Sequence, residues 1–243
     1  MTAPLFLVPA DVLASAGAGD VVVLDGDEGR HAADVRRLRA GEQVSVGDGV
    51  GVVVRGEVAE VGRGRLTVSV RERVVLPRRE PRLVVVQALA KGGRDEDAVE
   101  AMTEVGVDEV LGWSASRSVA RWTDRTAAKW TASARAAAKQ SRSAWVPVVG
   151  GPMSSAQVAD RLRAATVAAV LHEEAEVRLA SVAVPPSGEV VVVVGPEGGI
   201  APDELALFAE AGAMSCRLGD AVLRSSTAGV VALSVLSATT RWR

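Results

Sequence analysis

The sequence contains few of the residues that build metal and disulfide sites. Its 243 residues include one cysteine, Cys216, and two histidines, His31 and His172. A single cysteine excludes an internal disulfide and suits a reducing compartment. So small a supply of thiols and imidazoles also disfavours a zinc site. We therefore expect no metal.

Long apolar runs and a strong net charge are also missing. No purely apolar run is longer than the five valines at 190–194, which is too short to span a bilayer. The first twenty residues lack the basic residues of a signal peptide. The net charge is −2 and 48% of the residues are hydrophobic, as expected for a folded globular chain. We expect a cytoplasmic protein that does not contact a membrane.

The basic residues are nevertheless unevenly distributed. Between Arg117 and Arg142 there are seven basic residues and one acidic residue, Asp124. Such a local excess of positive charge predicts a surface for phosphates. The alternative for any single residue of the set is a solvated helix face.

The first 75 residues have the pattern of an all-β domain. Short valine-rich segments (VVVL, EQVSV, GVVVRGEVAEV, RLTVSVRERVV) alternate with glycine turns, which predicts a small barrel. One interposed segment has helical spacing at His31, Val35 and Leu38. Residues 76–82, LPRREPR, have no apolar period and are predicted to be a linker.

Residues 83–243 alternate between strand and helix patterns. Buried strands are predicted at RLVVVQAL, DEVLGWSA, TVAAVLHEE and EVVVVVG. Helices are predicted at DEDAVEAMTEVGV, at 123–141, at PDELALFAEAG and at STAGVVALSVLSATT. This alternation indicates an α/β domain with a mostly parallel sheet covered on both faces.

A glycine-rich loop, GPEGG, follows the five valines. Open α/β sheets bind ligands at such strand ends. The spacing of Gly195, Gly198 and Gly199 fits neither the phosphate loop nor the dinucleotide fingerprint. The alternative is a tight turn in which the glycines serve only the backbone geometry.

The acidic residues around this loop disfavour an anionic ligand. A helix is predicted to start at Pro202, and Asp203 and Glu204 follow it directly. With Glu197 in the loop, a phosphate would face three carboxylates. We therefore expect a neutral or cationic ligand with hydroxyl groups, a description that fits an adenosyl group on a sulfonium centre.

Two motifs near the carboxyl end carry a family resemblance. GPEGG with its PDE helix start, followed by RLGDAVLRSSTAGVVAL at 217–233, resembles the SpoU–TrmD (SPOUT) class of knotted methyltransferases. The closer similarity is to the family that methylates N3 of a uridine in 16S, small-subunit ribosomal RNA. QALAKGGR, TEVGV, SRSVARW and AAAKQSRSAWVP follow in that family's order, so the resemblance covers nearly the whole chain.

The resemblance implies a fold, a cofactor and partners. The fold would be an N-terminal PUA-like β-barrel that binds RNA, followed by an α/β domain whose end forms a trefoil knot. The cofactor would be S-adenosylmethionine, bound between three loops of a homodimeric protein. The residues that the resemblance assigns to the cofactor are Leu171, His172, Glu173, Gly195, Pro196, Glu197, Gly198, Gly199, Leu218, Gly219, Val222, Leu223, Thr227 and Ala228.

The assigned catalytic residues are Arg224 and Glu197. A guanidinium at 224 would hold a uridine carbonyl and stabilise the anion formed when N3 loses its proton. Glu197 either binds a ribose hydroxyl or braces its loop, and an ion pair between the two residues is the structural alternative. The family usually has glutamate where this chain has Ser226 and lysine where it has Ala101, so no catalytic role is assigned to those positions.

The expected RNA partner is 16S rRNA or the small ribosomal subunit. Trp122, Trp130 and Trp145 either stack bases or serve as core or interface anchors, and the scarcity of aromatic residues favours the second role. The predicted RNA-binding residues are Arg36, Arg37, Arg39, Lys91, Arg121, Arg125, Lys129, Arg135, Lys139 and Arg142.

Three other functions compete with the uridine methyltransferase. A related enzyme could modify a ribose 2′-hydroxyl or transfer RNA. A non-catalytic RNA-binding protein of ribosome assembly would keep the fold, and Ser226 keeps that alternative open. A nucleotide-dependent oxidoreductase is disfavoured by the glycine spacing.

Overall fold

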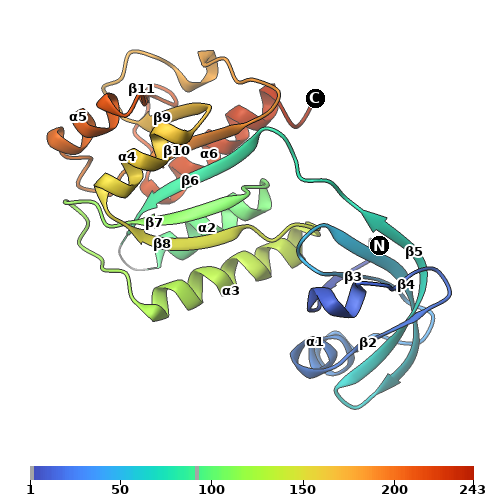
Figure 1. Ribbon diagram of the computed structural model, residues 1–243. Helices are drawn as coiled ribbons and strands as arrows, with labels where there is room; N and C mark the ends of the chain where they lie inside the picture. Colours follow the sequence, from blue (N-terminus) through green and yellow to red (C-terminus); the bar gives the residue numbers. More distant parts are fainter. Residues whose placement is uncertain (1–2, 91–92) are drawn as a thin grey trace. The chain divides into compact units, whose positions relative to one another are not determined.

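The computed structural model describes residues 3–90 and 93–243. The chain forms two compact units (Figure 1). Unit 1 comprises Met1–Arg78 together with Ala138–Val146, and unit 2 comprises Arg79–Ala137 together with Pro147–Arg243. The boundaries drawn from the sequence, 1–75, 76–82 and 83–243, stay a prediction.

Unit 1 is built on a five-stranded, mostly antiparallel sheet, so the all-β expectation is confirmed. The strand order is β1-β3-β4-β5-β2, and only β1 and β3 run parallel. The alternating valines of β4 and β5 bury one face in a single core. The strands are β1 (Leu5–Leu7), β2 (Val21–Leu24), β3 (Gln43–Gly47), β4 (Val52–Gly62) and β5 (Arg65–Val75).

Short helical turns fill the connections of unit 1. The predicted helical segment consists of α1 (Gly26–Arg30), which continues as a π-helical turn, η2 (His31–Val35). His31 packs edge-on against Phe6, with 6.1 Å between ring centroids, and so contributes to packing. A 3-10 turn, η1 (Ala10–Leu13), precedes β2.

Unit 2 has a six-stranded sheet in which every pairing is parallel, as predicted. The strand order is β11-β9-β10-β6-β7-β8. The strands are β6 (Arg82–Ala88), β7 (Glu109–Trp113), β8 (Val148–Met153), β9 (Val167–Leu171), β10 (Glu189–Val194) and β11 (Met214–Cys216). The helices are α2 (Arg94–Glu104), α3 (Asp124–Ser141), α4 (Ser155–Ala164), α5 (Pro202–Glu210) and α6 (Ser225–Thr239), with a 3-10 turn η3 (Leu179–Ser181).

Helices cover both faces of this sheet, with α2, α3 and α6 on one face and α4 and α5 on the other (Figure 1). The valines of β10 explain the arrangement. Val190, Val192 and Val194 face the first set of helices, and Val191 and Val193 face the second. A strand buried on both sides needs an unbroken apolar run, which is what the sequence supplies.

The tryptophans of unit 2 serve packing. Trp130 is fully buried, donates its Nε1–H to Asp95 Oδ2 at 3.1 Å and meets Trp122 edge-on. In unit 1, Trp145 lies under the Arg78 guanidinium, 4.7 Å from the ring centroid. The role as core anchors favoured by the sequence is confirmed for Trp130.

The amino ends of the unit 2 strands are closed by charged residues. Arg82 and Arg161 each pair with both Glu109 and Glu189, at N–O distances of 2.7–3.1 Å. This ring joins β6, β7, β10 and α4. The carboxyl ends of the strands, at the opposite edge of the sheet, are free of this ring and can contact a ligand.

The last turn of the chain is fixed by Arg241. Its side chain is 3% exposed and forms an ion pair with Asp108. It also donates to the carbonyl oxygens of Pro81 and Gly106 at 2.9 and 2.7 Å. These contacts join the residues after α6 to the segments that precede β6 and β7. The trefoil knot implied by the resemblance stays a prediction.

Candidate active site

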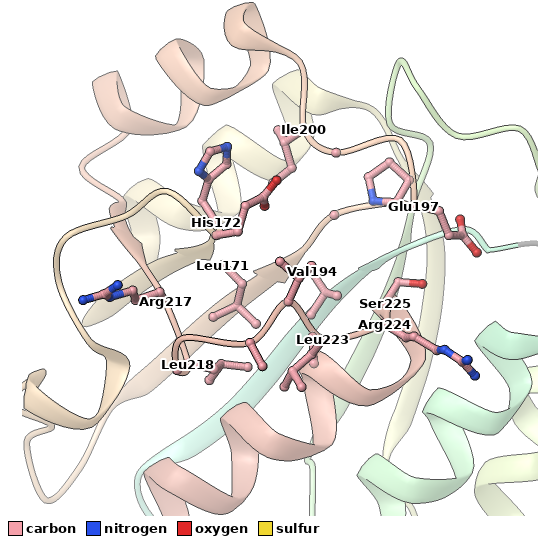
Figure 2. Close-up of a pocket in the computed structure, with 18 of the residues that line it drawn as sticks. Leu171, His172, Val194, Glu197, Ile200, Arg217, Leu218, Leu223, Arg224 and Ser225 are labelled. Atoms are coloured by element: carbon pink, nitrogen blue, oxygen red, sulfur yellow. The ribbon is translucent and has the colours of Figure 1, made fainter.

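Three loops meet at the carboxyl ends of β9, β10 and β11. These strands are neighbours in the sheet and parallel, so their ends lie at one edge. The loops and the first turn of α6 surround a cavity of 360 Å³ (Figure 2). A cavity of this volume is within the range of small-molecule sites.

Most of the residues predicted to bind the cofactor line this one cavity. Glu197 and Arg224, the predicted catalytic residues, line it as well. The other predicted residues in the lining are Leu171, His172, Glu173, Gly195, Pro196, Gly199, Leu218, Gly219, Val222, Leu223 and Ala228. Segments as far apart in sequence as Leu171 and Ala228 are therefore brought together, although contact with a cofactor stays a prediction.

Two predicted cofactor residues are not part of the lining that the structure describes. The carbonyl of Gly198 accepts from Arg117 Nη1 at 3.2 Å, so that residue joins the loop to the segment after β7. Thr227 is exposed, and its N–H donates to Arg224 O in the first turn of α6. Arg224 is the N-cap of α6 and makes no side-chain capping hydrogen bond.

The cavity also has lining residues that the sequence did not indicate. Arg94 comes from the first turn of α2, about a hundred residues from the glycine loop, and no local signal marks it. Ile200 follows GPEGG directly and could have been included with that motif. The other additional lining residues are Val194, Cys216, Arg217, Asp220, Ala221 and Ser225.

The centre of the cavity is apolar and its rim is charged. Figure 2 shows Leu171, Leu218 and Leu223 gathered at the centre. The side chains of Arg217 and Arg224 extend away from this group in opposite directions (Figure 2). Such a cavity suits an uncharged ring system at its centre and a polar group at its rim.

Ser225 supplies a polar atom without a partner. The residue is 8% exposed, and its Oγ makes no hydrogen bond to any atom in the described part of the chain. An unsatisfied buried hydroxyl is costly, so it marks a place where a ligand would be stabilised. Together with the cavity's volume and apolar centre, this atom fits a ligand that has both rings and hydroxyl groups.

His172 is held at the end of β9. Its backbone N–H donates to Cys216 O at 2.9 Å, and its Nδ1 accepts from the N–H of Glu174 at 3.3 Å. A neutral imidazole in this arrangement carries its proton on Nε2. Burial raises the pKa of the neighbouring Cys216 thiol, so the cysteine stays protonated and serves packing.

Glu204, in the first turn of α5, fixes the residues that follow the glycine loop. Its carboxylate is buried and accepts from Ser116 N at 2.9 Å, Ser116 Oγ at 3.0 Å, Ser155 Oγ at 2.7 Å and Ala201 N at 3.3 Å. Neither Glu204 nor Asp203 lines the cavity. The expectation that Glu197, Asp203 and Glu204 would all face a ligand is therefore wrong. Of these three residues, Glu197 lines the cavity.

Glu197 pairs with Arg94 rather than with Arg224. The Glu197 Oε1 to Arg94 Nη1 distance is 3.9 Å, and both side chains are about half exposed, so the pair contributes little. For Arg224, no ion pair or side-chain hydrogen bond is found within residues 3–90 and 93–243. An exposed, unpaired guanidinium at the rim is available to a substrate.

The predicted RNA-binding residues differ in their surroundings. Lys139 is bound to Glu28 by two contacts of 2.8 Å within unit 1, and Lys129 forms an ion pair with Glu96 in unit 2. Lys91 lies outside the described residues. The exposed members of the set are Arg36, Arg37, Arg39, Arg121, Arg125, Lys129, Arg135 and Arg142. Contact with RNA stays a prediction for all of them.

Neither a metal cluster nor a membrane-spanning helix occurs in the part of the chain that the structure describes. Across residues 3–90 and 93–243, no group of three His, Cys, Asp or Glu side chains is placed to hold a metal ion. In those ranges no helix has the length and apolar character needed to cross a membrane.

Comparison with known families and structures gives matches over the whole chain. Residues 78–237 match the RNA methyltransferase domain family, and residues 24–71 match the RNA methyltransferase PUA domain. The crystal structure of a ribosomal RNA small subunit methyltransferase E from Neisseria gonorrhoeae, bound to S-adenosyl methionine, has the same fold. Its TM-score is 0.88 at 23% identity, with 98% of each chain covered.

Curated sequences give a higher identity. Ribosomal RNA small subunit methyltransferase E of Mycobacterium tuberculosis is 48% identical over 251 residues, covering 100% of this chain and 94% of the relative. The protein of that name from Bacillus subtilis is 30% identical, with 88% of each chain covered. On the strength of the cavity, the two-domain match and these identities, the chain belongs to the ribosomal RNA small subunit methyltransferase E family.

Proposed function

We propose that this protein uses S-adenosylmethionine to methylate N3 of one uridine in 16S ribosomal RNA, acting as a homodimer in the cytoplasm. The observation that carries the proposal is the 48% identity to a small-subunit rRNA methyltransferase across the whole chain. The cavity supports it, because its lining contains most of the residues that the resemblance assigns to the cofactor. The relative determined with bound S-adenosyl methionine supports the cofactor.

The lining residues suit the proposed cofactor. Leu171, Leu218 and Leu223 offer an apolar centre for an adenine ring, and the loop backbones can bind its polar edge. Ser225 Oγ and Glu197 are among the polar groups available to the ribose hydroxyl groups and the amino group of the cofactor. When bound, S-adenosylmethionine supplies an electrophilic methyl group on a sulfonium centre.

Arg224 is the residue proposed to act on the uridine. The N3 atom lies on the Watson–Crick edge, so the target base must be unpaired or extruded from its stack. A guanidinium that donates to the O2 or O4 carbonyl would orient N3 and stabilise the negative charge that develops as its proton leaves. Holding acceptor and donor in line supplies much of the remaining rate enhancement.

Analysis of ribosomal RNA tests this function. We expect 16S rRNA from a strain lacking the gene to have lost one 3-methyluridine, detected by mass spectrometry of nuclease fragments. Reintroduction of the wild-type gene should restore it. Loss of a methyl group from a ribose, or from transfer RNA, would contradict the N3 assignment. Unchanged methylation of both 16S rRNA and transfer RNA would contradict the enzymatic function.

A glycine substitution tests where the cofactor lies. A Cβ at position 219 would meet no heavy atom within 4 Å in the described chain, so Gly219→Ala should leave the unfolding free energy within about 0.5 kcal/mol of wild type. A ligand against this loop would meet the added methyl group. We expect S-adenosylmethionine to bind roughly tenfold more weakly by isothermal titration, the effect of about 1.4 kcal/mol of overpacking.

The matched control is Gly17→Ala in unit 1. Its Cβ would lie 3.9 Å from the nearest atom, Asp20 Oδ2, which is ordinary contact. This variant should bind the cofactor as wild type does. Equal affinities for the two variants would mean that the ligand does not lie against Gly219, and binding of NAD in place of S-adenosylmethionine would refute the cofactor.

A further inference from the structure

We propose that the tip of the β4–β5 hairpin in unit 1 is part of an RNA-binding surface. The tip carries Arg63 and Arg65, and neither was indicated by the sequence patterns. The arginines that follow the helical segment, Arg36, Arg37 and Arg39, come shortly after Asp34, whose Oδ1 lies 3.5 Å from the backbone nitrogen of Gly64 in the tip. We call these five residues the arginine surface. The inference rests on the proposed function, and it names the partner as the phosphate backbone of the substrate RNA.

The hairpin turn and the helical segment are in close contact (Figure 1). A Cβ on Gly29, in α1, would lie 2.5 Å from the carbonyl oxygen of Gly64, between the two hairpin arginines. A Cβ on Gly64 would in turn lie 3.2 Å from Arg30 Cγ, and Gly64 has a left-handed φ of +64°. Two glycines are therefore needed for this approach, which places both groups of arginines on adjoining backbone.

Within the described residues, the side chains of the five arginines of the surface have no protein partner. All are exposed, and no ion pair or side-chain hydrogen bond involves them in the portion of the chain with assigned positions. The nearby acids Asp27 and Asp34 form no ion pair with these arginines in the described chain. Asp27 pairs with Arg30, and Asp34 lies beside the backbone N–H of Gly64 at 3.5 Å.

Elsewhere on the same two strands, arginines are paired. Arg55 on β4 is 3.0 Å from Glu72, and Arg71 on β5 forms an ion pair with Glu57. Arg73 donates to the carbonyl oxygen of Ala16 at 3.2 Å. The arginines on the body of the hairpin are therefore bound to protein groups, whereas Arg63 and Arg65 at its tip have no such partner in the described residues. They stay unpaired although the chain has a net charge of −2.

Unpaired guanidinium groups suit a phosphate backbone. Each presents a planar fork of donors that matches two phosphate oxygens and keeps its charge at any physiological pH. Several such groups on adjoining turns can follow successive phosphates of one strand. Contacts of this kind provide affinity and orientation without reading the base sequence.

The experiment compares two variants that remove equal charge from the same hairpin. Arg63→Ala with Arg65→Ala removes two unpaired cations, and Arg55→Ala with Arg71→Ala removes two paired ones. Binding of a 16S rRNA transcript is measured at several salt concentrations. For the first variant we expect about tenfold weaker binding and a log K against log salt slope smaller by about 1.5, as for two lost phosphate contacts. The second should keep the wild-type slope.

The two variants distinguish RNA contact at the hairpin tip from a general effect of lost positive charge. Equal losses in the two variants would show a general charge effect, and a wild-type slope in the first would mean that the tip does not contact RNA; either result overturns the inference. Thermal melting checks that both variants are folded. Because binding is measured without methylation, an inactive wild-type protein would refute the proposed function while leaving this result intact.

Discussion

Arg224→Ala is expected to lower the rate of methyl transfer by about 10²–10³-fold, the effect of removing a preorganised donor to developing negative charge. The side chain is exposed, without a partner in the described ranges, and extends from the cavity rim (Figure 2). Because it lies outside the apolar centre, affinity for S-adenosylmethionine should change little. Single-turnover transfer of labelled methyl groups to 16S rRNA, with titration of the cofactor, measures both quantities.

Two further variants make this result specific. Arg163→Ala removes an exposed arginine that pairs with Asp160 on α4 and should leave the transfer rate unchanged. Arg224→Lys keeps the positive charge but loses the planar fork, so it should recover only part of the rate. Full activity in Arg224→Ala would remove the proposed role. A large loss of affinity for S-adenosylmethionine would indicate that Arg224 contacts the cofactor rather than the uridine.

Arg241→Ala is expected to cause the largest loss of stability. The arginine is 3% exposed and its ion-pair partner, Asp108, is 14% exposed. Removing one partner of a buried pair typically costs about 3–5 kcal/mol, because the remaining charge is left uncompensated. Two backbone carbonyls would also lose their donors. Urea unfolding followed by circular dichroism measures the change in unfolding free energy.

The control for this prediction lies two residues further along the chain. Arg243→Ala changes an exposed arginine near the same terminus and should stay within about 0.5 kcal/mol of wild type. An equal, small effect of the two substitutions would mean that the end of the chain contributes nothing to stability. Loss of stability in Arg241→Ala alone supports the network around Asp108.

Elements with strong local patterns were predictable from the sequence. The valines of β10 are apolar on both faces, and the helix that follows starts at Pro202 as expected. Val99 and Met102 lie in the predicted helix DEDAVEAMTEVGV and are fully buried. In each case the pattern reflects the burial of apolar side chains, which provides the main driving force for folding.

Other elements were missed because their patterns are weak or because their signals were not used. β8, with the sequence VVGGPM, is an edge strand without a fully buried residue, so it lacks both alternation and a continuous apolar run. α4 was also missed, although Ser154 and Gln157 form a capping box, which is a local signal for a helix start. This helix start is therefore one that the sequence itself marks.

The site was predictable where it consists of motifs and unpredictable where it depends on distant contacts. GPEGG and the loop at 217–224 line one cavity, as the resemblance implied. The position of Arg94 depends on how α2 packs, and the partners of Glu204 come from two separate segments. Sequence spacing contains no information on such long-range contacts, so the pairing of Glu197 with Arg94 and the inward position of Glu204 required the structure.

The division of α3 between the units has a practical consequence for fragments of this protein. Ala144, Trp145 and Val146 pack against Leu5, Leu7 and Val53 of the barrel. A recombinant piece ending near residue 78 would therefore expose an apolar patch and would tend to aggregate. Neither half can be excised as one contiguous stretch. A soluble RNA-binding fragment would need residues 138–146 rejoined to the amino-terminal piece, for example through a short glycine-serine tether.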